Sequence, residues 1–374
     1  MVPTARRQVN KLQLAKPSVG DAELAAVGRV LATGMMTRGP EVDAFESELA
    51  TLTNRKHAVS VSSGTTALEL SMWAIDLKPG DEVIVPGFGF PSAATAVARL
   101  GGVVVPADVE PKSWNLCPKS VEAVATPKTR ALISIDQFGL VSSSEELKQI
   151  ANARNWEWIS DSACAVGASA PSGIPAGKNG RAAIFSFHPR KLIAAGEGGA
   201  VVTDDDDFAD DVRARRNLGQ IAPGNFAKMG TNARLSDIAA AIARVQLQRL
   251  DAMISERQLL VDGYKSRLSD LLKKERLSWQ IPPNGAIPAN QTFAVLLSQN
   301  GPSREQVAEH LGKALVACGP ATYAAHRVLS YVNSTEALPM SEKLHDHALA
   351  IPLFSGMRSA DLDRVASLLE EALT

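Results

Sequence analysis

The sequence between residues 57 and 160 alternates short apolar runs with helical segments, and this alternation limits the fold more than any other feature. The apolar runs, typical of strands, are 57–61, 82–86, 101–109, 130–135 and 156–160. The helical segments are 62–73, 91–100, 119–125 and 145–153. Strands that alternate with helices of this length form a mostly parallel sheet with helices on both faces. We therefore expect a large α/β domain.

The pattern changes after this region. Two apolar runs, 182–187 and 199–203, follow with no helix between them, so an antiparallel pair is expected there. Residues 237–272 then show one long helical pattern. The last segment combines a strand at 292–297 with helices at 304–315 and 360–373, and Ser359 is a natural N-cap for the final helix. This mixture indicates a smaller α+β domain.

The length of the chain agrees with two domains, because 374 residues exceed the usual size of about 150 residues per domain. We expect a large domain over residues 1–250, in which residues 1–20 form an N-terminal arm, and a small C-terminal domain over residues 251–374. Just after the arm, Leu24, Val27 and Leu31 recur at helical spacing and predict a helix with these side chains on one face.

The charge balance argues against some classes of partner. The chain has 39 Lys and Arg residues against 40 Asp and Glu residues, so it lacks the basic excess of proteins that bind nucleic acid or acidic membranes. It also lacks an apolar stretch of about 20 residues and a secretory signal. Its three cysteines include no CxxC pair, which fits a reducing compartment. We expect a soluble cytoplasmic protein without nucleic-acid or membrane partners.

Three motifs invite a functional interpretation that we consider weak. Residues 87–92 imitate a GxGxxG dinucleotide motif, but Pro91 interrupts it and Ser92 occupies its last position. The aspartates at 204–207, 210 and 211 are better explained as the start of a helix than as a metal site, because consecutive carboxylates cannot all face one ion. His345 and His347 lack further ligands nearby in the sequence. No metal site is predicted.

Three other features support one another. Residues 62–67 lie where a strand passes into a helix, and the free N–H groups at such a helix start attract phosphate. Asp161 follows an apolar strand at the edge where open α/β sheets bind ligands, so its carboxylate is expected to be partly buried. Lys191 lies in a loop between two buried strands, with Gly196, Gly198 and Gly199 following, where its amine can act as a nucleophile.

A pyridoxal phosphate enzyme needs this combination. It requires an anion cradle for the phosphate, an acid beside the pyridine nitrogen, an aromatic ring against the cofactor and a lysine that forms a Schiff base with it.

The same residues resemble those of the DegT/DnrJ/StrS family, the sugar aminotransferases of fold type I, over nearly the whole chain. The matching segments are 39–46, 63–68, 79–86, 186–191 with 196–199, 232–237, 246–250 and 351–354, together with Asp161. The resemblance implies a large domain with a mixed, mostly parallel seven-stranded sheet between helices, and a smaller C-terminal α+β domain.

The resemblance also implies roles for individual residues. Lys191 would be the Schiff-base lysine and the acid/base of the reaction, and Asp161 would pair with the pyridinium nitrogen. Phe90 would stack on the cofactor ring, and Asn232 would reach the phosphate of the neighbouring subunit, which implies a homodimer with shared active sites. The residues that would hold the phosphate within the chain are Gly64, Thr65 and Ser186.

Two positions depart from the family pattern. Cys164 stands where relatives commonly have Gln or His bonded to the phenolic oxygen of the cofactor, and a thiol is a weaker hydrogen-bond donor. Gly89 replaces the usual Thr before the stacking aromatic. Lys191 is retained, whereas the dehydratase branch of the family carries histidine there.

The leading hypothesis is an aminotransferase that uses pyridoxal phosphate to move an amino group from an amino acid, L-glutamate, to a nucleotide-linked keto sugar in amino-sugar biosynthesis. Three residues are assigned to the substrate region: His188, Tyr323 and His326. The alternatives are a cyclitol aminotransferase or sugar dehydratase of the same family, and a non-catalytic regulatory protein that binds the cofactor. A NAD-linked dehydrogenase rests only on the interrupted glycine motif.

Overall fold

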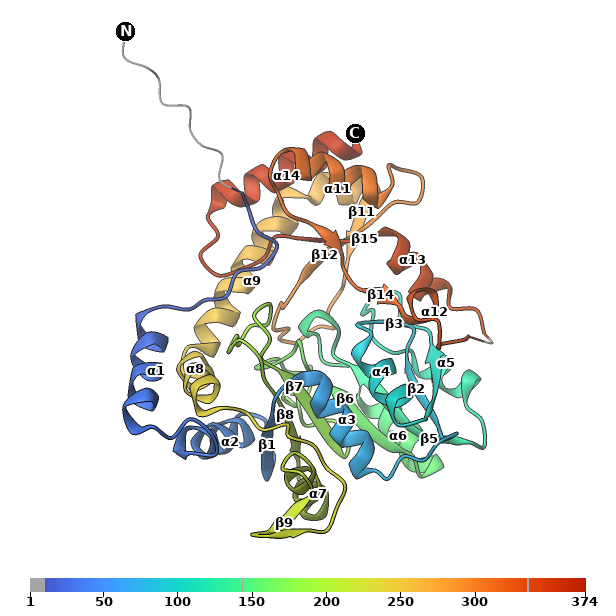
Figure 1. The fold of residues 1–374 in the computed structure, drawn as a ribbon. Helices are drawn as coiled ribbons and strands as arrows, with labels where there is room; N and C mark the ends of the chain where they lie inside the picture. The colour runs from blue at the N-terminus through green and yellow to red at the C-terminus, as the bar shows by residue number, and fades with distance from the viewer. Residues whose placement is uncertain (1–10, 143, 335) are drawn as a thin grey trace.

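A computed structural model describes residues 11–142, 144–334 and 336–374 (Figure 1). Its centre is a seven-stranded sheet with the strand order β1-β8-β7-β6-β5-β2-β4. The strands are β1 (His57–Val61), β2 (Glu82–Pro86), β4 (Val103–Ala107), β5 (Thr129–Ile135), β6 (Glu157–Asp161), β7 (Ala182–Ser186) and β8 (Gly199–Thr203). The pairs β1–β8 and β7–β8 are antiparallel, and the other pairs are parallel. The predicted α/β class and the antiparallel β7–β8 pair are confirmed.

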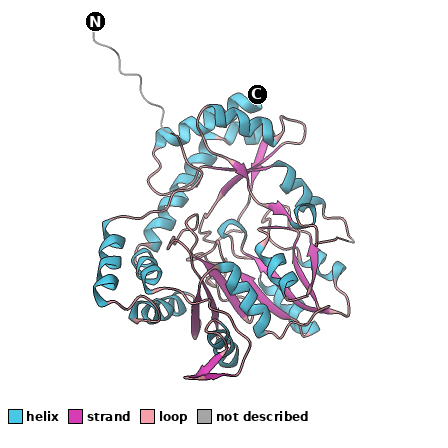
Figure 2. Cartoon of the chain, viewed as in Figure 1, coloured by secondary structure: helices cyan, strands magenta, loops and turns pink. Residues whose placement is uncertain are grey.

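Helices cover both faces of this sheet (Figure 2). Those on one face are α3 (Gly64–Ala74), α4 (Ser92–Arg99) and α7 (Asp206–Arg215). Those on the other are α2 (Pro40–Leu52), α5 (Pro118–Val124), α6 (Ser144–Arg154) and α8 (Asp237–Leu247). Neighbouring side chains of a strand point to opposite faces, so Val83 packs in the first layer and Ile84 in the second. The strands are therefore buried on both sides.

The aspartate run at the start of α7 behaves as predicted. Asp205 is the N-cap of the helix and accepts a hydrogen bond from the backbone N–H of Phe208 at 2.9 Å. Asp204 pairs with Arg55 and Lys178. Among the described residues, no group of His, Cys, Asp and Glu has the arrangement of a metal site.

Helix α1 (Asp21–Thr33) exists as predicted, but it buries another face than expected. Ala26 and Val30 pack against α8, whereas Leu24 and Leu31 are 72% and 55% exposed. The small side chains allow close approach to α8, and Glu23 forms an ion pair with Arg249 that fixes the rotation of the helix. The apolar residues Leu24 and Leu31 therefore remain on the surface of the chain.

The C-terminal part forms an antiparallel four-stranded sheet with the order β11-β12-β15-β13. Its strands are β11 (Leu277–Trp279), β12 (Phe293–Leu297), β13 (Gly319–Pro320) and β15 (Ala348–Ile351). Its helices are α9 (Leu250–Arg267), α10 (Ser269–Lys273), α11 (Arg304–Lys313) and α14 (Ser359–Leu373). Only β12 was predicted among these strands, because the other three are too short to show a clear alternation.

Two details of this part differ from the sequence prediction. The long helical pattern is divided into α8, α9 and α10, and the first break falls at Gln248 and Arg249. Ser359 is the first residue of α14 and not its N-cap. Its hydroxyl instead accepts a hydrogen bond from Arg267 at 2.7 Å, which ties α14 to α9.

Short elements complete the described part of the chain. They are β3 (Phe88–Gly89), the 3-10 turn η1 (Gln137–Gly139), β9 (Gln220–Ala222), β10 (Asn225–Phe226), β14 (Tyr323–Ala324), α12 (Ala325–Val328) and α13 (Pro339–His347). Strand β14 lies in the chain between β13 and β15 of the small sheet, and it pairs with β3, which follows β2 of the large sheet. The residues that resembled a dinucleotide motif therefore form part of a connection between the two sheets.

We propose that the boundary between the large and the small domain lies at residue 250, where α9 begins. The first turns of α9 pack into the core of the large domain through Met253 and Ile254, and its later turns pack into the small domain through Val261 and Tyr264. The arm also reaches the small domain, since Leu12 exchanges backbone hydrogen bonds with residues 315 and 317. None of the helices in the described ranges is long and apolar enough to cross a membrane.

Candidate active site

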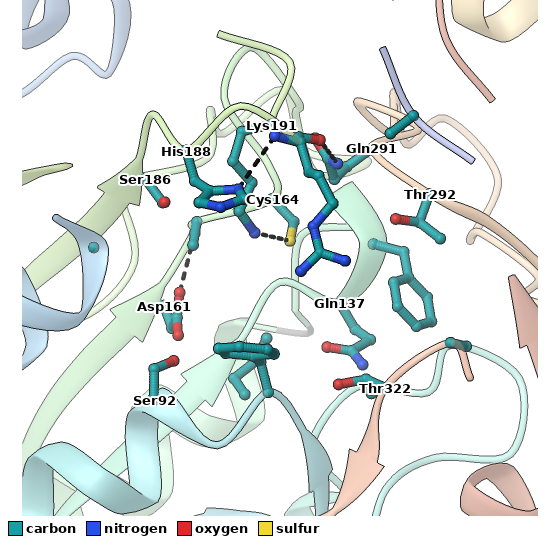
Figure 3. Close-up of a pocket in the computed structure, with 18 of the residues that line it drawn as sticks. Ser92, Gln137, Asp161, Cys164, Ser186, His188, Lys191, Gln291, Thr292 and Thr322 are labelled. Carbon is teal, nitrogen blue, oxygen red and sulfur yellow. Dashed lines mark hydrogen bonds between the residues drawn. The ribbon is translucent and has the colours of Figure 1, made fainter. Parts of the chain in front are cut away.

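A cavity of about 280 Å³ opens at the carboxyl ends of β5, β6 and β7. The ends of these strands contribute Ile135, Asp161 and Ser186, while the small domain closes the cavity with residues such as Thr322 and Ile351. Parallel strands direct their carboxyl ends to one edge of the sheet, so residues distant in the sequence meet there. Figure 3 shows how the side chains converge on this space.

The loop between β7 and β8 holds Lys191 at the cavity. Behind it, the backbone of Ala194 is bonded to the side chain of Gln246, which is fully buried: its Oε1 accepts from the Ala194 N–H at 2.7 Å and its Nε2 donates to the Ala194 carbonyl at 3.1 Å. Leu192 and Ile193 are also buried. The loop is therefore anchored through its backbone, and the side chains of His188, Arg190 and Lys191 line the cavity.

The amine of Lys191 meets the thiol of Cys164. Nζ donates a hydrogen bond to Sγ at 3.0 Å (Figure 3). Cys164 follows β6 by three residues, so the end of one strand and the loop after the next bring these two groups together.

Asp161 is the last residue of β6 and is only 5% exposed. Its Oδ1 accepts a hydrogen bond from the backbone N–H of Ala163 at 3.1 Å. Burial raises the pKa of Asp161 to about 6, although the Ala163 hydrogen bond and the charge of Lys191 oppose this rise. A buried carboxylate is stabilised by a cation, and a protonated pyridine nitrogen would supply one. The site thus fits the pyridine end of pyridoxal phosphate.

A second buried carboxylate lies behind Asp161. Asp136 is fully buried and accepts hydrogen bonds from the hydroxyl of Ser162 at 2.6 Å and from the backbone N–H of Ser142 at 2.8 Å. Burial raises the pKa of Asp136, and its proximity contributes to the raised pKa of Asp161. The sequence alone did not single out this residue.

The start of α3 forms the other end of the cavity. The hydroxyl of Ser63 caps the helix by accepting a hydrogen bond from the N–H of Thr66 at 3.1 Å. A methyl group at Gly64 would lie 2.8 Å from Cβ of Ser186, so only glycine allows the helix start to approach this serine. Backbone N–H groups and hydroxyls therefore gather at a helix N-terminus, where a phosphate is stabilised. This arrangement fits the phosphate end of the cofactor.

Most of the residues predicted for the site line the cavity together: Gly64, Thr65, Phe90, Asp161, Cys164, Ser186, His188, Lys191 and Tyr323. Asn232 and His326 do not. Asn232 is exposed and forms an isolated bridge with Asn217, away from the cavity of its own chain. His326 lies on α12, where its Nε2 is 3.1 Å from Oε1 of Glu342.

Several cavity residues carried no signal in the sequence analysis. They include Gln137, Gln291, Thr292 and Thr322. Gln137 is the second residue after β5, at the functional edge of the sheet, so its position could have been found by the argument that found Asp161. Gln291 and Thr322 come from the small domain, and no local pattern shows that they face the large one.

Comparisons with known proteins agree with this geometry. The sequence model described as the DegT/DnrJ/EryC1/StrS aminotransferase family matches residues 17–370. A GDP-perosamine synthase of Caulobacter vibrioides is 32% identical over 337 residues, which cover 88% of this chain and 89% of that protein.

Two solved structures are similar in fold and sequence. DesI, crystallised in the presence of its TDP-sugar product, has a TM-score of 0.90 at 30% identity and covers 99% of this chain and 94% of its own. A GDP-4-keto-6-deoxymannose-3-dehydratase with a trapped PLP-glutamate geminal diamine has a TM-score of 0.89 at 25% identity, covering 96% of this chain and 100% of its own.

Proposed function

Because the chain belongs to the DegT/DnrJ/EryC1/StrS aminotransferase family, and is thus a pyridoxal phosphate-dependent aminotransferase, we propose that it transfers the amino group of L-glutamate to a nucleotide-linked keto sugar. The observation that carries this proposal is the convergence of Lys191, Asp161 and the Gly64–Ser186 contact on one cavity. The names of two relatives support a sugar nucleotide as substrate. The glutamate trapped in the dehydratase supports the amino donor.

Each of the side chains at the cavity would have its own role in the reaction. When bound, the cofactor supplies an electron-poor ring that withdraws electrons from the amine-bearing carbon of the substrate. Asp161 would hold the proton on the pyridine nitrogen, and the N–H groups at the start of α3 would hold the phosphate. Lys191 would anchor the cofactor and, when its amine is free, would move a proton at the amine-bearing carbon. Phe90 would contact the ring face.

We further propose a homodimer with shared active sites, in which Asn232 reaches the phosphate in the neighbouring subunit. Asn232 is exposed and does not line the cavity of its own chain, which supports this role. Apolar side chains near it and on α1 are also exposed, and a second subunit would cover them. They include Leu24, Leu31, Ile221, Phe226 and Met229.

We also propose that the protein is located in the cytoplasm. All three cysteines are free in the structure, as expected in a reducing compartment.

The visible absorption spectrum of the purified protein tests the proposal. Protein loaded with pyridoxal phosphate should be yellow, lose its visible band on addition of L-glutamate and recover it with a nucleotide-linked keto sugar. Lys191→Ala should remove the response, whereas Lys119→Ala, at an exposed lysine on α5, should respond as the wild type does. A protein that gains no band with the cofactor would refute the mechanism.

Elimination is the second candidate, because a dehydratase is among the similar structures. It predicts that the visible band returns with loss of a hydroxyl group from the sugar and without a new amine. Mass spectrometry of the sugar product separates the two outcomes: an amine replaces the carbonyl oxygen in transamination, whereas in the dehydratase reaction hydrogen replaces one hydroxyl group, the carbonyl is restored and the amino nitrogen leaves as ammonia.

A further inference from the structure

Three buried polar atoms at the cavity have no hydrogen-bond partner among the described residues. They are Nε2 of Gln137, Oε1 of Gln291 and Oγ1 of Thr322. The three residues are only 4%, 7% and 7% exposed, respectively. An unpaired polar group in a buried place is unfavourable, so native proteins rarely retain one without a partner such as a ligand. Their common position at one cavity indicates a ligand that supplies the missing bonds.

Gln137 and Thr322 lie apart from the groups proposed to hold the cofactor, whereas Gln291 contacts the loop of Lys191. Figure 3 shows Gln137 and Thr322 on the side away from Asp161 and Ser186. The groups that fit the pyridine and phosphate ends of the cofactor, Asp161 and the start of α3 with Ser186, lie on the other side. The three residues line the cavity, so their unpaired atoms lie beside the space that remains for the substrate.

Hydrogen bonds hold the backbone of Gln137, and they fix the position from which its side chain extends. Its N–H donates to Oδ1 of Asn115 at 3.0 Å, and its carbonyl accepts from Nε2 of Gln280 at 3.0 Å. The next residue, Phe138, has a positive φ of 57°, which turns the chain sharply at the end of β5. The turn presents the amide of Gln137 to the cavity.

Thr322 is supplied by the small domain. It lies between β13, in the small sheet, and β14, which pairs with β3 beside the large sheet. Gln291 also belongs to the small domain, and its Nε2 donates to the carbonyl of Arg190, next to Lys191, at 2.5 Å. The unpaired atoms thus come from both domains, and they can contact one ligand only when the domains are arranged as they are here.

The chemistry of the three groups selects the kind of ligand. An amide N–H donates, an amide oxygen accepts, and a threonine hydroxyl does both; none carries a charge. A carboxylate or phosphate would call for a cation, whereas a hydroxyl group can both donate and accept. Neutral groups of this kind match the hydroxyls of a sugar ring.

We propose that Gln137 and Thr322, assisted by Gln291, form a subsite that binds ring hydroxyls of the sugar acceptor next to its reacting carbonyl. The subsite rests on the proposed function, and it makes these residues determinants of which keto sugar is accepted. Because Gln291 also supports the loop of Lys191, the other two residues provide the cleaner test.

The test uses holoenzyme that L-glutamate has first charged with an amino group. The probes are GDP-4-keto-6-deoxymannose and its 3-deoxy counterpart, and the measured quantity is kcat/KM for recovery of the visible band. Gln137→Leu and Thr322→Val should each lower kcat/KM for the hydroxylated probe by about 5- to 10-fold, the usual size of one neutral hydrogen bond. At least one variant should also lose the preference of the wild type for the hydroxylated probe.

Matched substitutions outside the cavity are the controls. Gln149→Leu on α6 and Thr51→Val on α2 remove the same groups from exposed positions, and they should not change either half-reaction. The reaction with L-glutamate reports whether a variant has damaged the site itself. A loss confined to the sugar half-reaction supports the subsite.

Three results would overturn the inference. If Gln137→Leu and Thr322→Val slow both half-reactions equally, the residues do not bind the sugar specifically. If both variants keep the wild-type preference between the probes, the residues do not recognise the hydroxyl group of the sugar. If the wild type responds to L-glutamate but transfers nothing to either probe, the proposed acceptor and the subsite fail together. The wild-type measurement therefore separates failure of the function from failure of the subsite alone.

Discussion

The side-chain amine of Lys191 lies 3.0 Å from the sulfur of Cys164 and donates a hydrogen bond to it. The pair joins the end of β6 to the loop after β7, and both residues line the cavity. Cys164 occupies a position where a stronger hydrogen-bonding side chain was expected from the family resemblance. The reactivity of this thiol beside the active amine can be measured by alkylation.

Cys164 should be the most rapidly alkylated cysteine of the cofactor-free protein. Burial raises the pKa of Cys318 to about 11, and burial and the nearby Glu110 raise the pKa of Cys117, so both have little reactive thiolate at pH 8. Iodoacetamide at pH 8, followed by peptide mass spectrometry, should find the label chiefly on Cys164. Pyridoxal phosphate should protect it, and faster labelling of Cys117 or Cys318 would contradict the prediction.

Asp161→Asn should stabilise the cofactor-free protein while damaging the enzyme. The pKa of Asp161 rises from 3.8 to about 6 on folding, so between these values the folded chain holds a proton that the unfolded chain has lost. The free energy of unfolding therefore falls as pH increases through this range, and it stays lower at higher pH. Asparagine removes the charge but can still accept the Ala163 hydrogen bond.

The free energy of unfolding should accordingly increase by about 3 kcal/mol at pH 7.5 and by little at pH 4. Urea denaturation at both pH values measures this difference, with Asp251→Asn on the exposed side of α9 as the control. The transamination rate of the loaded variant should fall by roughly 100- to 1000-fold. Equal stabilities of wild type and variant at pH 7.5 would show that the buried carboxylate carries no such cost.

Gly64→Ala should weaken cofactor binding because its methyl group would lie 2.8 Å from Cβ of Ser186. The start of α3 must then move away from the serine, which separates the groups proposed to hold the phosphate. We expect the Kd for pyridoxal phosphate to increase by at least about 10-fold, the effect of losing one charge-assisted hydrogen bond. Fluorescence titration with the cofactor measures this change.

Gly28→Ala is the matched control for this substitution. Gly28 lies within α1, and a methyl group there would have no neighbour within 4 Å. Alanine should stabilise that helix by about 0.5–1 kcal/mol and leave the Kd unchanged. An unchanged Kd in Gly64→Ala would mean that the helix start is not the phosphate site.

Mixing two inactive variants should restore activity if subunits share their active sites. A Lys191→Ala subunit lacks its own lysine but can offer an intact Asn232 to its neighbour. In a mixed dimer, an Asn232→Ala subunit keeps Lys191 and receives Asn232 from that neighbour, so one of two sites is complete. Random exchange of equal amounts should yield about one quarter of wild-type activity by the statistics of pairing in a C2 dimer. Activity that stays at the level of the separate variants would refute the shared site.

The order of elements and the reactive residues could be predicted from the sequence because their signals are local. A strand with apolar residues on both faces can only be a buried strand, and Asp161 at its carboxyl end is then at the ligand-binding edge. Lys191 could be found because its loop is bounded by two such strands. Ser359 was misplaced as an N-cap for the opposite reason: its hydroxyl is bound by Arg267, 92 residues away.

Other features depend on contacts that no short segment records. Leu24, Val27 and Leu31 have helical spacing, yet α1 rotates to place Ala26 against α8, because the partner helix decides which face fits. Likewise, neither Gln137 nor Thr322 stands in a recognisable motif, since their shared cavity exists only after β14 pairs with β3.

The sequence by itself determined the α/β alternation, the lysine, the aspartate and the glycine at the helix start, since each depends on residue type and on neighbours along the chain. The tertiary structure alone decided that Cys164 meets Lys191, that Asp136 lies behind Asp161, and that two domains bring unpaired amide and hydroxyl groups to one cavity. The physical reason is that hydrogen bonds and desolvation act between groups close in space, whereas the pattern of a sequence records only what is close along the chain.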